Sequence, residues 1–282
     1  VSPVGLTGLI WPQSEQILAR AAAKYRFPYT LSTAATEAPE TIGSLVDGMG
    51  WFQLYPPRRS EIRRDLLLRA RDAGFTTMLV TADVPTVSRR ERAVRVGVTV
   101  PPRITPLMLY RCAVRPLWTL ATLLAGAPRF QGLEKYLDGR DMQDMINFIG
   151  QELGGSLDWE YLQAVRDEWH GPLVIKGLLD VDQAERAVAL GFDGVLVSNH
   201  GGRQFDSAPA AISVLPGIAS AVGERATILF DSGMESGLDI VRALSLGADF
   251  VLLGRAFMFG VAALGRNGGD HVAEILIEDL KN

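Results

Sequence analysis

The apolar residues of this chain gather in short continuous runs, and three of these runs follow a glycine at the end of a stretch with helical periodicity. The three segments are Gly74–Thr81, Gly191–Ser198 and Gly247–Gly254. A glycine at this position predicts a helix that ends in the left-handed conformation. The run that follows is too uniformly apolar for a strand with one face in water, and it favours a parallel strand buried on both faces. Helix, glycine and strand in repetition indicate βα units.

Eight strands of this kind can be placed along the chain, although the first is partial. Their predicted ranges are 1–4, 29–32, 50–54, 77–81, 173–176, 194–198, 227–231 and 250–253. Eight parallel strands with helices between them favour an α/β fold of the (β/α)8 TIM-barrel type over an open doubly wound sheet. No predicted strand runs into a Gly-x-Gly-x-x-Gly turn. We therefore expect one barrel domain over residues 1–282, in which residues 84–171 form a long insertion or lid after the fourth strand.

Composition and charge exclude several classes of function. The 282 residues include 28 basic and 32 acidic side chains, so the net charge of -4 offers no basic surface for nucleic acid. Cys112 is the one cysteine, which excludes an internal disulfide and a cysteine-based zinc site, and we predict no metal site. No apolar run is long enough to span a bilayer. The single cysteine agrees with a reducing compartment, and we expect the protein to be cytoplasmic.

Polar side chains stand at the ends of nearly all the predicted strands. In a barrel these carboxyl ends open on one face, where the loops build active sites. The residues concerned are Ser32, Gln53, Tyr55, Thr81, Asp83, Lys176, Ser198, His200, Asp231, Gly254 and Arg255. Each of them alone has an ordinary structural interpretation, such as a solvated strand cap. Their convergence on one mouth indicates an active site.

The chemistry of one group suits a small carboxylate that loses a proton. His200 is a natural proton acceptor near neutral pH, and Asp83 could orient its imidazole. Arg203 follows two glycines and carries the planar fork that binds a carboxylate with two hydrogen bonds. Arg90, in the loop after the fourth strand, could add a second cation. A solvated basic face around Arg90 is the alternative interpretation of that residue.

A second group suits a phosphate. Short turns of small residues, Asp231–Gly233 and Gly254–Arg255, follow the last two predicted strands and open helices. Backbone N–H groups at helix starts in this part of a barrel commonly bind phosphate. Lys176, which we expect to be a mobile cation at the mouth, suits a negative charge that develops on a cofactor ring. Phosphate, ring and small acid together suggest flavin mononucleotide (FMN), although barrels that bind sugar phosphates share the same turns.

The motifs that contain these predicted site residues also resemble those of a known family. They are SNHGGRQ (198–204), FQLY (52–55), TADVP with RRER (81–92), IKG (175–177), DSG (231–233) and LLGRA (252–256). Together they resemble the FMN-dependent L-2-hydroxy acid oxidase and dehydrogenase family, and most of all its L-lactate and mandelate dehydrogenase branch. The resemblance extends over nearly the whole chain. It implies oxidation of an L-2-hydroxy acid to the 2-oxo acid with FMN as the cofactor.

The resemblance also implies roles for individual residues. His200 would be the catalytic base and Asp83 its hydrogen-bond partner, while Tyr55 would hydrogen-bond the substrate near its hydroxyl. Arg203 and Arg90 would hold the substrate carboxylate. The positions that match the flavin-binding residues of the family are Pro3, Val4, Ser32, Gln53, Thr81, Lys176 and Ser198 for the ring, and Asp231, Gly233, Gly254 and Arg255 for the ribityl phosphate.

The chain departs from the family pattern at several points. Glu235 stands where family members usually carry an arginine that helps to bind the FMN phosphate, which predicts weakened FMN binding. Ala34 stands where glycolate oxidases often have tryptophan, so the substrate pocket should be wider and admit lactate, mandelate or longer acids. We also expect the N-terminal and C-terminal segments of the family to be absent, which leaves a truncated, non-catalytic barrel that binds a hydroxy acid as one alternative.

The predicted partners follow from the insertion and from the family. Residues 107–127 include an apolar helix preceded by Arg111 and Arg115. This segment has two interpretations, a helix lying on a membrane surface beside a quinone acceptor, or an ordinary lid helix packed on the barrel. Electrons would leave FMN for a quinone or another acceptor, and an oxidase that uses oxygen and makes hydrogen peroxide is the alternative. The resemblance further suggests a homotetramer, peripheral on the cytoplasmic face of the membrane.

Overall fold

A computed structural model of the chain describes residues 1–85, 95, 104–137, 142–153 and 157–282. Its seven strands form one parallel sheet in which every strand pairs with its neighbours in chain order. The strands are β1 (Tyr29–Ser32), β2 (Gly50–Leu54), β3 (Thr77–Thr81), β4 (Leu173–Leu178), β5 (Gly194–Val197), β6 (Thr227–Phe230) and β7 (Phe250–Val251). This order and the alternating helices confirm the predicted TIM-barrel architecture.

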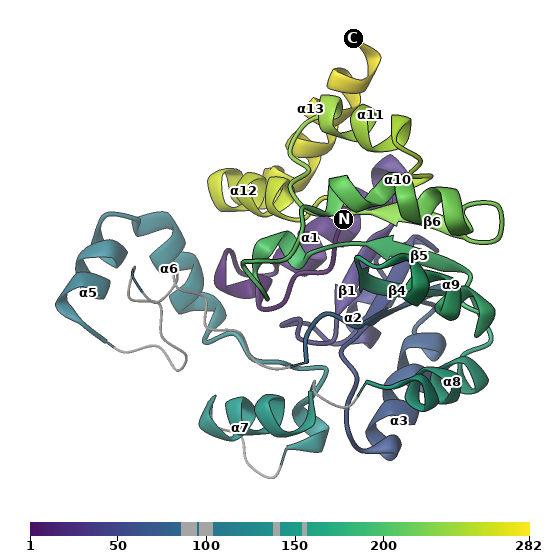
Figure 1. Cartoon of the computed structure of the whole chain (residues 1–282). Helices are drawn as coiled ribbons and strands as arrows, with labels where there is room; N and C mark the ends of the chain where they lie inside the picture. The colour runs from purple at the N-terminus through teal and green to yellow at the C-terminus, as the bar shows by residue number, and fades with distance from the viewer. Residues whose placement is uncertain (86–94, 96–103, 138–141, 154–156) are drawn as a thin grey trace.

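Helices connect the strands and cover the outside of the sheet (Figure 1). They are α1 (Ser14–Tyr25), α2 (Pro39–Gly43), α3 (Ser60–Asp72), α5 (Pro106–Ala113), α6 (Pro116–Ala125), α7 (Met142–Glu152), α8 (Trp159–Glu168), α9 (Val181–Ala189), α10 (Ala211–Val222), α11 (Gly237–Ser245), α12 (Arg255–Leu264) and α13 (Gly268–Lys281). Four short 3-10 helices complete the described chain: η1 (Thr7–Leu9), η2 (Glu134–Tyr136), η3 (His200–Gly202) and η4 (Gly265–Asn267).

The predicted first strand, residues 1–4, does not form as a strand. Instead, two backbone hydrogen bonds place this segment between the outer strands of the sheet. The N–H of Ser2 donates to the carbonyl of Leu253 (2.9 Å), and the N–H of Thr30 donates to the carbonyl of Val1 (3.1 Å). Pro3 has no N–H to donate, which ends the ladder after Ser2. Residues 1–4, which we call the seam segment, therefore lie between β7 and β1 and join the two ends of the sheet, at the seam of the barrel, without becoming an eighth strand.

The three predicted glycine caps are confirmed. Gly74, Gly191 and Gly247 have φ angles of 86°, 93° and 103°, in the left-handed region that glycine adopts without a steric penalty. Each of them turns the chain from the end of a helix into the next strand of the sheet. The local signal in the sequence was sufficient here because the cap needs only a residue without a Cβ.

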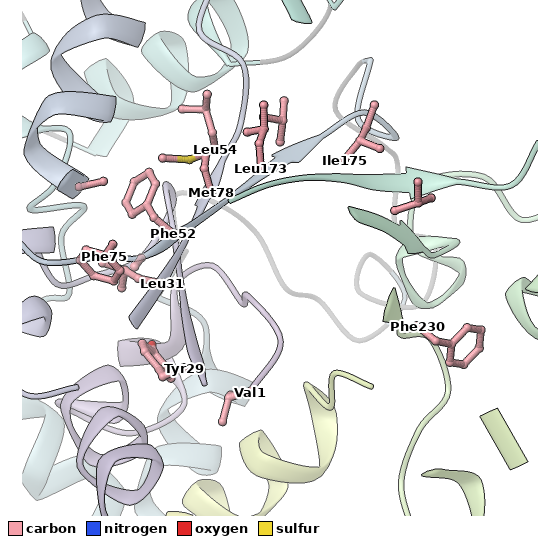
Figure 2. Packing of buried hydrophobic residues seen from close by; sticks show 14 of the residues in the cluster. Val1, Tyr29, Leu31, Phe52, Leu54, Phe75, Met78, Leu173, Ile175 and Phe230 are labelled. Atoms are coloured by element: carbon pink, nitrogen blue, oxygen red, sulfur yellow. The ribbon is translucent and has the colours of Figure 1, made fainter. Parts of the chain in front are cut away.

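Two separate apolar cores lie on the two faces of the sheet. The inner core is formed by one residue from each of the strands β3 to β6 and by the residue that follows β7, namely Leu79, Val174, Leu196, Leu229 and Leu252. The larger outer core fills the space between the strands and the helices. Phe52 and Phe75, whose ring centroids are 5.8 Å apart, belong to the part of this outer core drawn in Figure 2. Burial on both faces explains why the strands read as continuous apolar runs.

The described residues between β3 and β4 include the helices α5, α6, α7 and α8. Leu162 and Val165 of α8 are buried in the outer core, so α8 is the barrel helix that leads into β4. Phe130 and Leu133 are buried as well, and the Arg69 guanidinium of α3 donates to the carbonyl of Gly132 (2.6 Å). These contacts fix the middle of the segment against the barrel.

In contrast, α5 and α6 project from one side of the barrel (Figure 1). The Trp118 indole N–H donates to the Ile10 carbonyl (2.9 Å) and ties α6 to the segment before α1. Large apolar side chains nevertheless remain exposed on both helices, including Leu117 (78%), Leu123 (75%) and Leu124 (80%). Among the residues that the structure describes, no helix combines the length and apolar character needed to cross a bilayer.

Candidate active site

The inward side chains of the strands change from apolar to polar where the strands end. Residues two apart on a strand share a face, so Thr81 lies above Leu79, and Asp231 follows Leu229 on the same side. We call the resulting set the polar layer; it comprises Ser32, Gln53, Thr81, Lys176, Ser198 and Asp231, all of them buried. The sequence predicted all six at the carboxyl ends of the strands, and the structure brings them together there.

Half of the polar layer is a chain of neutral hydrogen bonds. The Ser32 hydroxyl donates to Gln53 Oε1 (2.7 Å), and Gln53 Nε2 donates to the Thr81 hydroxyl oxygen (2.8 Å). The carbonyl of Gln53 also accepts from the Thr33 hydroxyl (2.6 Å). These bonds fix the amide of Gln53 in one orientation across three neighbouring strands.

The other half of the polar layer is a buried ion pair. Lys176 Nζ donates to Asp231 Oδ2 (2.5 Å) and to the Ser198 hydroxyl oxygen (2.9 Å), and the lysine side chain is only 3% exposed. Burial alone raises the pKa of the Asp231 carboxyl. The Lys176 ammonium and the hydroxyls of Ser198 and Ser232 outweigh that effect and hold the pKa below its usual value. The expectation of a mobile Lys176 is wrong, because a buried ammonium is stable only where it is paired.

His200 lies at the rim of the polar layer, in the 3-10 helix that follows β5. Its Nδ1 is 3.0 Å from Asp83 Oδ1 and 3.1 Å from Oδ2, and both side chains are largely buried, at 15% and 13% exposure. An ionised carboxylate can only accept a hydrogen bond, so Nδ1 carries the proton in this contact. His200 has a φ of 57°, a left-handed conformation that is uncommon outside glycine.

The backbone around His200 is held by two serine hydroxyls. Ser198 Oγ accepts from the N–H of His200 (3.0 Å), while Ser232 Oγ accepts from the N–H groups of Asn199 (3.1 Å) and Gly201 (3.2 Å). Ser232 is a residue for which the sequence predicted no role of its own. No local signal could have revealed it, because these contacts join loops that follow two different strands.

Gly177 is a second residue for which the sequence predicted no role of its own. The pairing of β4 with β5 shifts register between Lys176 and Leu178, so Gly177 is an irregular position with a φ of 101°. A Cβ at this position would lie 2.5 Å from Asp83 Cγ. A glycine next to a strand-end lysine is the kind of signal that marks a bulge or a close approach.

Of the remaining predicted residues, Ala34, Tyr55 and Arg203 lie in the segments that follow β1, β2 and β5. The N–H of Tyr55 donates to the Thr33 hydroxyl oxygen (3.0 Å), and the carbonyl of Ala34 accepts from the N–H of Leu6 (2.8 Å). Arg203 follows η3 and is exposed. Arg90 lies outside the described residues.

The residues predicted for the phosphate end lie close to His200 and to the segment at the seam. A Cβ placed on Gly254 would lie 3.6 Å from Val4 Cγ2, and one placed on Gly201 would lie 3.5 Å from Arg255 Nη2. Pro3, next to Val4, is partly buried. The seam segment, the His200 loop and the start of α12 are therefore neighbours.

The residues of this site fit FMN both at its ring and at its phosphate. The polar layer offers buried donors and acceptors to a polar ring edge. Gly233 is exposed with a φ of 84°, and a Cβ there would meet no atom within 4 Å, which leaves open space in the loop after β6. Arg255 begins α12 and combines a cation with a helix N-terminus, a combination that suits phosphate. Glu235 is exposed in the same region and opposes a phosphate.

A barrel with a proton acceptor, a buried cation and a phosphate-type helix start has the groups that a cofactor-dependent barrel oxidoreductase requires. Comparison with known families identifies the member of that class. The chain belongs to the FMN-dependent dehydrogenase family, which matches residues 1–282.

Individual relatives agree with this assignment. The L-lactate dehydrogenase of Pseudomonas paraeruginosa is 39% identical, over 100% of this chain and 74% of its own length. The L-lactate dehydrogenase of Xanthomonas euvesicatoria pv. vesicatoria is 40% identical, over 100% of this chain and 73% of its own length.

Solved structures resemble the chain as well. The crystal structure of the monotopic membrane protein (S)-mandelate dehydrogenase has a TM-score of 0.93 and 37% identity, over 99% of this chain and 74% of that one. A mandelate oxidase with (S)-2-phenylpropionate has a TM-score of 0.80 and 34% identity, over 100% and 71% of the two chains. The family, the FMN dependence and the chemistry of 2-hydroxy acid oxidation are thereby shown.

Proposed function

We propose that this enzyme oxidises an L-2-hydroxy acid of the lactate or mandelate kind to the 2-oxo acid, with His200 as the base. The observation that carries the proposal is the contact of His200 Nδ1 with the Asp83 carboxylate at 3.0 Å. An imidazole held in this way has one defined tautomer and a partner for the positive charge that it gains. A protein that only bound a hydroxy acid would have no use for such a pair.

The proton would be taken at Nε2, because Asp83 engages Nδ1. Asp83 would orient the ring and stabilise the imidazolium without accepting the proton itself. Oxidation removes two protons and two electrons from the substrate carbon and its hydroxyl. Tyr55 would hydrogen-bond the substrate hydroxyl, while Arg203 and Arg90 would hold the carboxylate so that the α-carbon faces His200.

FMN, when bound, supplies the acceptor for the two electrons. The residues that would hold its ring are Pro3, Val4, Ser32, Gln53, Thr81, Lys176 and Ser198, and those that would lie at its ribityl-phosphate end are Asp231, Gly233, Gly254 and Arg255. Because the Asp231 carboxylate can only accept hydrogen bonds, it would face the ribityl hydroxyls, and the phosphate would lie at the other three residues. Lys176 and Asp231 contribute a fixed, buried pair of charges to this surface.

The test is an anaerobic titration of the purified protein with L-lactate and with L-mandelate, followed by absorbance. Loss of the yellow flavin colour with either acid supports the proposal and begins to name the substrate. His200→Ala should keep its flavin yet lose the bleaching. A protein that stays unreactive after addition of FMN would favour the alternative of a non-catalytic barrel, and release of hydrogen peroxide during aerobic turnover would favour an oxidase.

We further propose that α5 and α6 lie on a membrane surface and that electrons pass from FMN to a quinone there. The exposed leucines of α6 and the neighbouring Arg111 and Arg115 have the composition of an interfacial helix. A relative of 37% identity, the (S)-mandelate dehydrogenase, is described as a monotopic membrane protein. The cytoplasmic face of the membrane is part of the same proposal.

A homotetramer is the proposed assembly. Leu238, Val241 and Leu244 of α11 are exposed at spacings of three residues and form an apolar stripe that suits contact with another copy of the chain. Light scattering of the holoenzyme in detergent measures its mass directly, and a monomeric mass would contradict this assembly.

A further inference from the structure

The hydroxyl of Ser232 is the meeting point of the loops that follow β5 and β6. It accepts hydrogen bonds from the N–H groups of Asn199 (3.1 Å) and Gly201 (3.2 Å), which are the two chain neighbours of His200. It donates to Asp231 Oδ1 (3.0 Å) and thereby connects to the buried Lys176. One hydroxyl thus joins both sides of His200 to the polar layer.

The backbone of Ser232 has an unfavourable conformation for the residue that occupies it. Its φ is 89°, in the region that glycine adopts freely and other residues rarely do. A glycine would therefore fit the backbone better than serine. Residues held in such conformations gather at functional sites, where a side chain is needed in spite of the strain. The side chain of Ser232 provides one group of this kind, the hydroxyl.

We propose that Ser232 is a positioning residue for His200. Its hydroxyl fixes the N–H groups on both sides of His200, so that the left-handed backbone of the histidine is held and the imidazole stays against Asp83. Ser198 completes the arrangement, since its hydroxyl oxygen accepts from the N–H of His200 itself (3.0 Å). This inference rests on the proposed function, because it treats His200 as the base.

Ser232→Gly separates this role from a merely structural one. The change relieves the backbone and removes the hydroxyl, so the holoenzyme should unfold at the same temperature as the wild type or at a higher one. Its flavin should be reduced more slowly by the substrate, by roughly ten- to a hundredfold, because a small misplacement of a catalytic group has a large effect on rate. Affinity for the 2-oxo acid product, measured by the change in the flavin spectrum, should stay within a few-fold of the wild type.

Ser232→Ala is the matched variant, because it also lacks the hydroxyl but retains the unfavourable backbone. Both variants should show the slow flavin reduction, and only Ser232→Ala should unfold at a lower temperature. A normal rate in Ser232→Gly, or a large loss of its thermal stability, would overturn the inference.

A double variant tests whether Ser232 acts through His200. In the His200→Ala background, Ser232→Gly should cause no further loss of the residual rate of flavin reduction. An equal additional loss would show that Ser232 acts elsewhere, which contradicts the inference. If His200→Ala itself reduces flavin at the wild-type rate, the proposed function fails. If His200→Ala is slow while Ser232→Gly is normal, only the positioning role fails.

Discussion

The carboxylate of Asp83 packs directly against Gly177, so closely that any residue with a Cβ at position 177 would clash with it. A Cβ at position 177 would lie 2.5 Å from Cγ and 2.6 Å from Cβ of Asp83, well inside any real contact between side chains. The bulge in β4 thus serves two groups at once. It leaves the Lys176 side chain inside the polar layer, and it opens a space in which Asp83 can reach His200.

Gly177→Ala should therefore displace Asp83 and slow flavin reduction by roughly a hundredfold. Gly74→Ala is the control, because Gly74 has a similar positive φ of 86° and no atom lies within 4 Å of its Cβ position. Both variants suffer the same kind of backbone strain, and only the first meets Asp83. Anaerobic stopped-flow measurement compares the two, and equal rates would contradict a special role for the space above Gly177.

Removal of the Lys176 ammonium should leave a buried, uncompensated carboxylate. We expect Lys176→Met to lower the free energy of unfolding by about 3–5 kcal/mol at pH 7. In the wild type, the pKa of Asp231 is held below its usual value, so the contribution of its ionised form is complete above about pH 4 and is lost as the pH falls through the folded-state pKa. In the variant, burial raises that pKa, and the deficit should shrink as the pH falls from 7 towards 5.

Urea unfolding of the cofactor-free protein at both pH values measures this effect. The double variant Lys176→Met/Asp231→Asn removes both charges and should recover most of the lost stability. A single variant as stable as the wild type at pH 7 would show that Asp231 finds another partner.

Glu235→Arg should tighten FMN binding, since it exchanges a repulsive charge for an attractive one near the start of α11. Because Glu235 is exposed and screened by solvent, we expect a gain of only roughly five- to tenfold in affinity. Glu224→Arg makes the same change of charge before β6, at the opposite end of the barrel, and should leave the affinity unchanged. Quenching of flavin fluorescence on titration of the cofactor-free protein gives both dissociation constants.

Loss of apolar surface from α6 should weaken binding to membranes. The double variant Leu117→Ser/Leu124→Ser removes two of the most exposed leucines, each worth about 1.5–3 kcal/mol when fully buried. Its sedimentation with vesicles of phosphatidylethanolamine and phosphatidylglycerol should fall at least severalfold. Leu68→Ser/Leu264→Ser removes exposed apolar side chains from α3 and α12 instead, away from the α11 stripe, and its unchanged sedimentation would assign the effect to α6.

A bulky residue in place of Ala34 should narrow the choice of substrate. Ala34→Trp is expected to lower kcat/KM for L-mandelate roughly tenfold more than for L-lactate, because an aromatic substrate needs the space that the new ring would take. Parallel steady-state measurements with the two acids give the ratio. An unchanged ratio would place the substrate side chain away from Ala34.

The sequence predicts those features of the fold that depend on local pattern. The buried strands follow from continuous apolar runs, and the left-handed helix ends follow from Gly74, Gly191 and Gly247. The contact of His200 with Asp83 could also be anticipated, because parallel strands bring their carboxyl ends to one edge.

The rest depends on contacts between distant segments. The sequence does not reveal that Lys176 is buried beside Asp231, since a lysine at a strand end is usually solvated. The positive φ of Ser232 cannot be predicted from the sequence either, because the packing of the loops after β5 and β6 determines it. The missing first strand has a local cause, the absent N–H of Pro3, but the seam that replaces it joins Ser2 to Leu253.

That seam has a consequence for the order in which the barrel assembles. Each of the strands β1 to β7 pairs with the next one along the chain, so the sheet can grow by steps between successive βα units. Closure instead joins residues far apart in sequence, as in the hydrogen bond from the Ser2 hydroxyl to Asp231, which are 229 positions apart. The entropy of closing so long a loop makes this a late step. We therefore expect the carboxylate that pairs with Lys176 to acquire its last partner only when the barrel closes, which makes competence to bind FMN a natural reporter of complete folding.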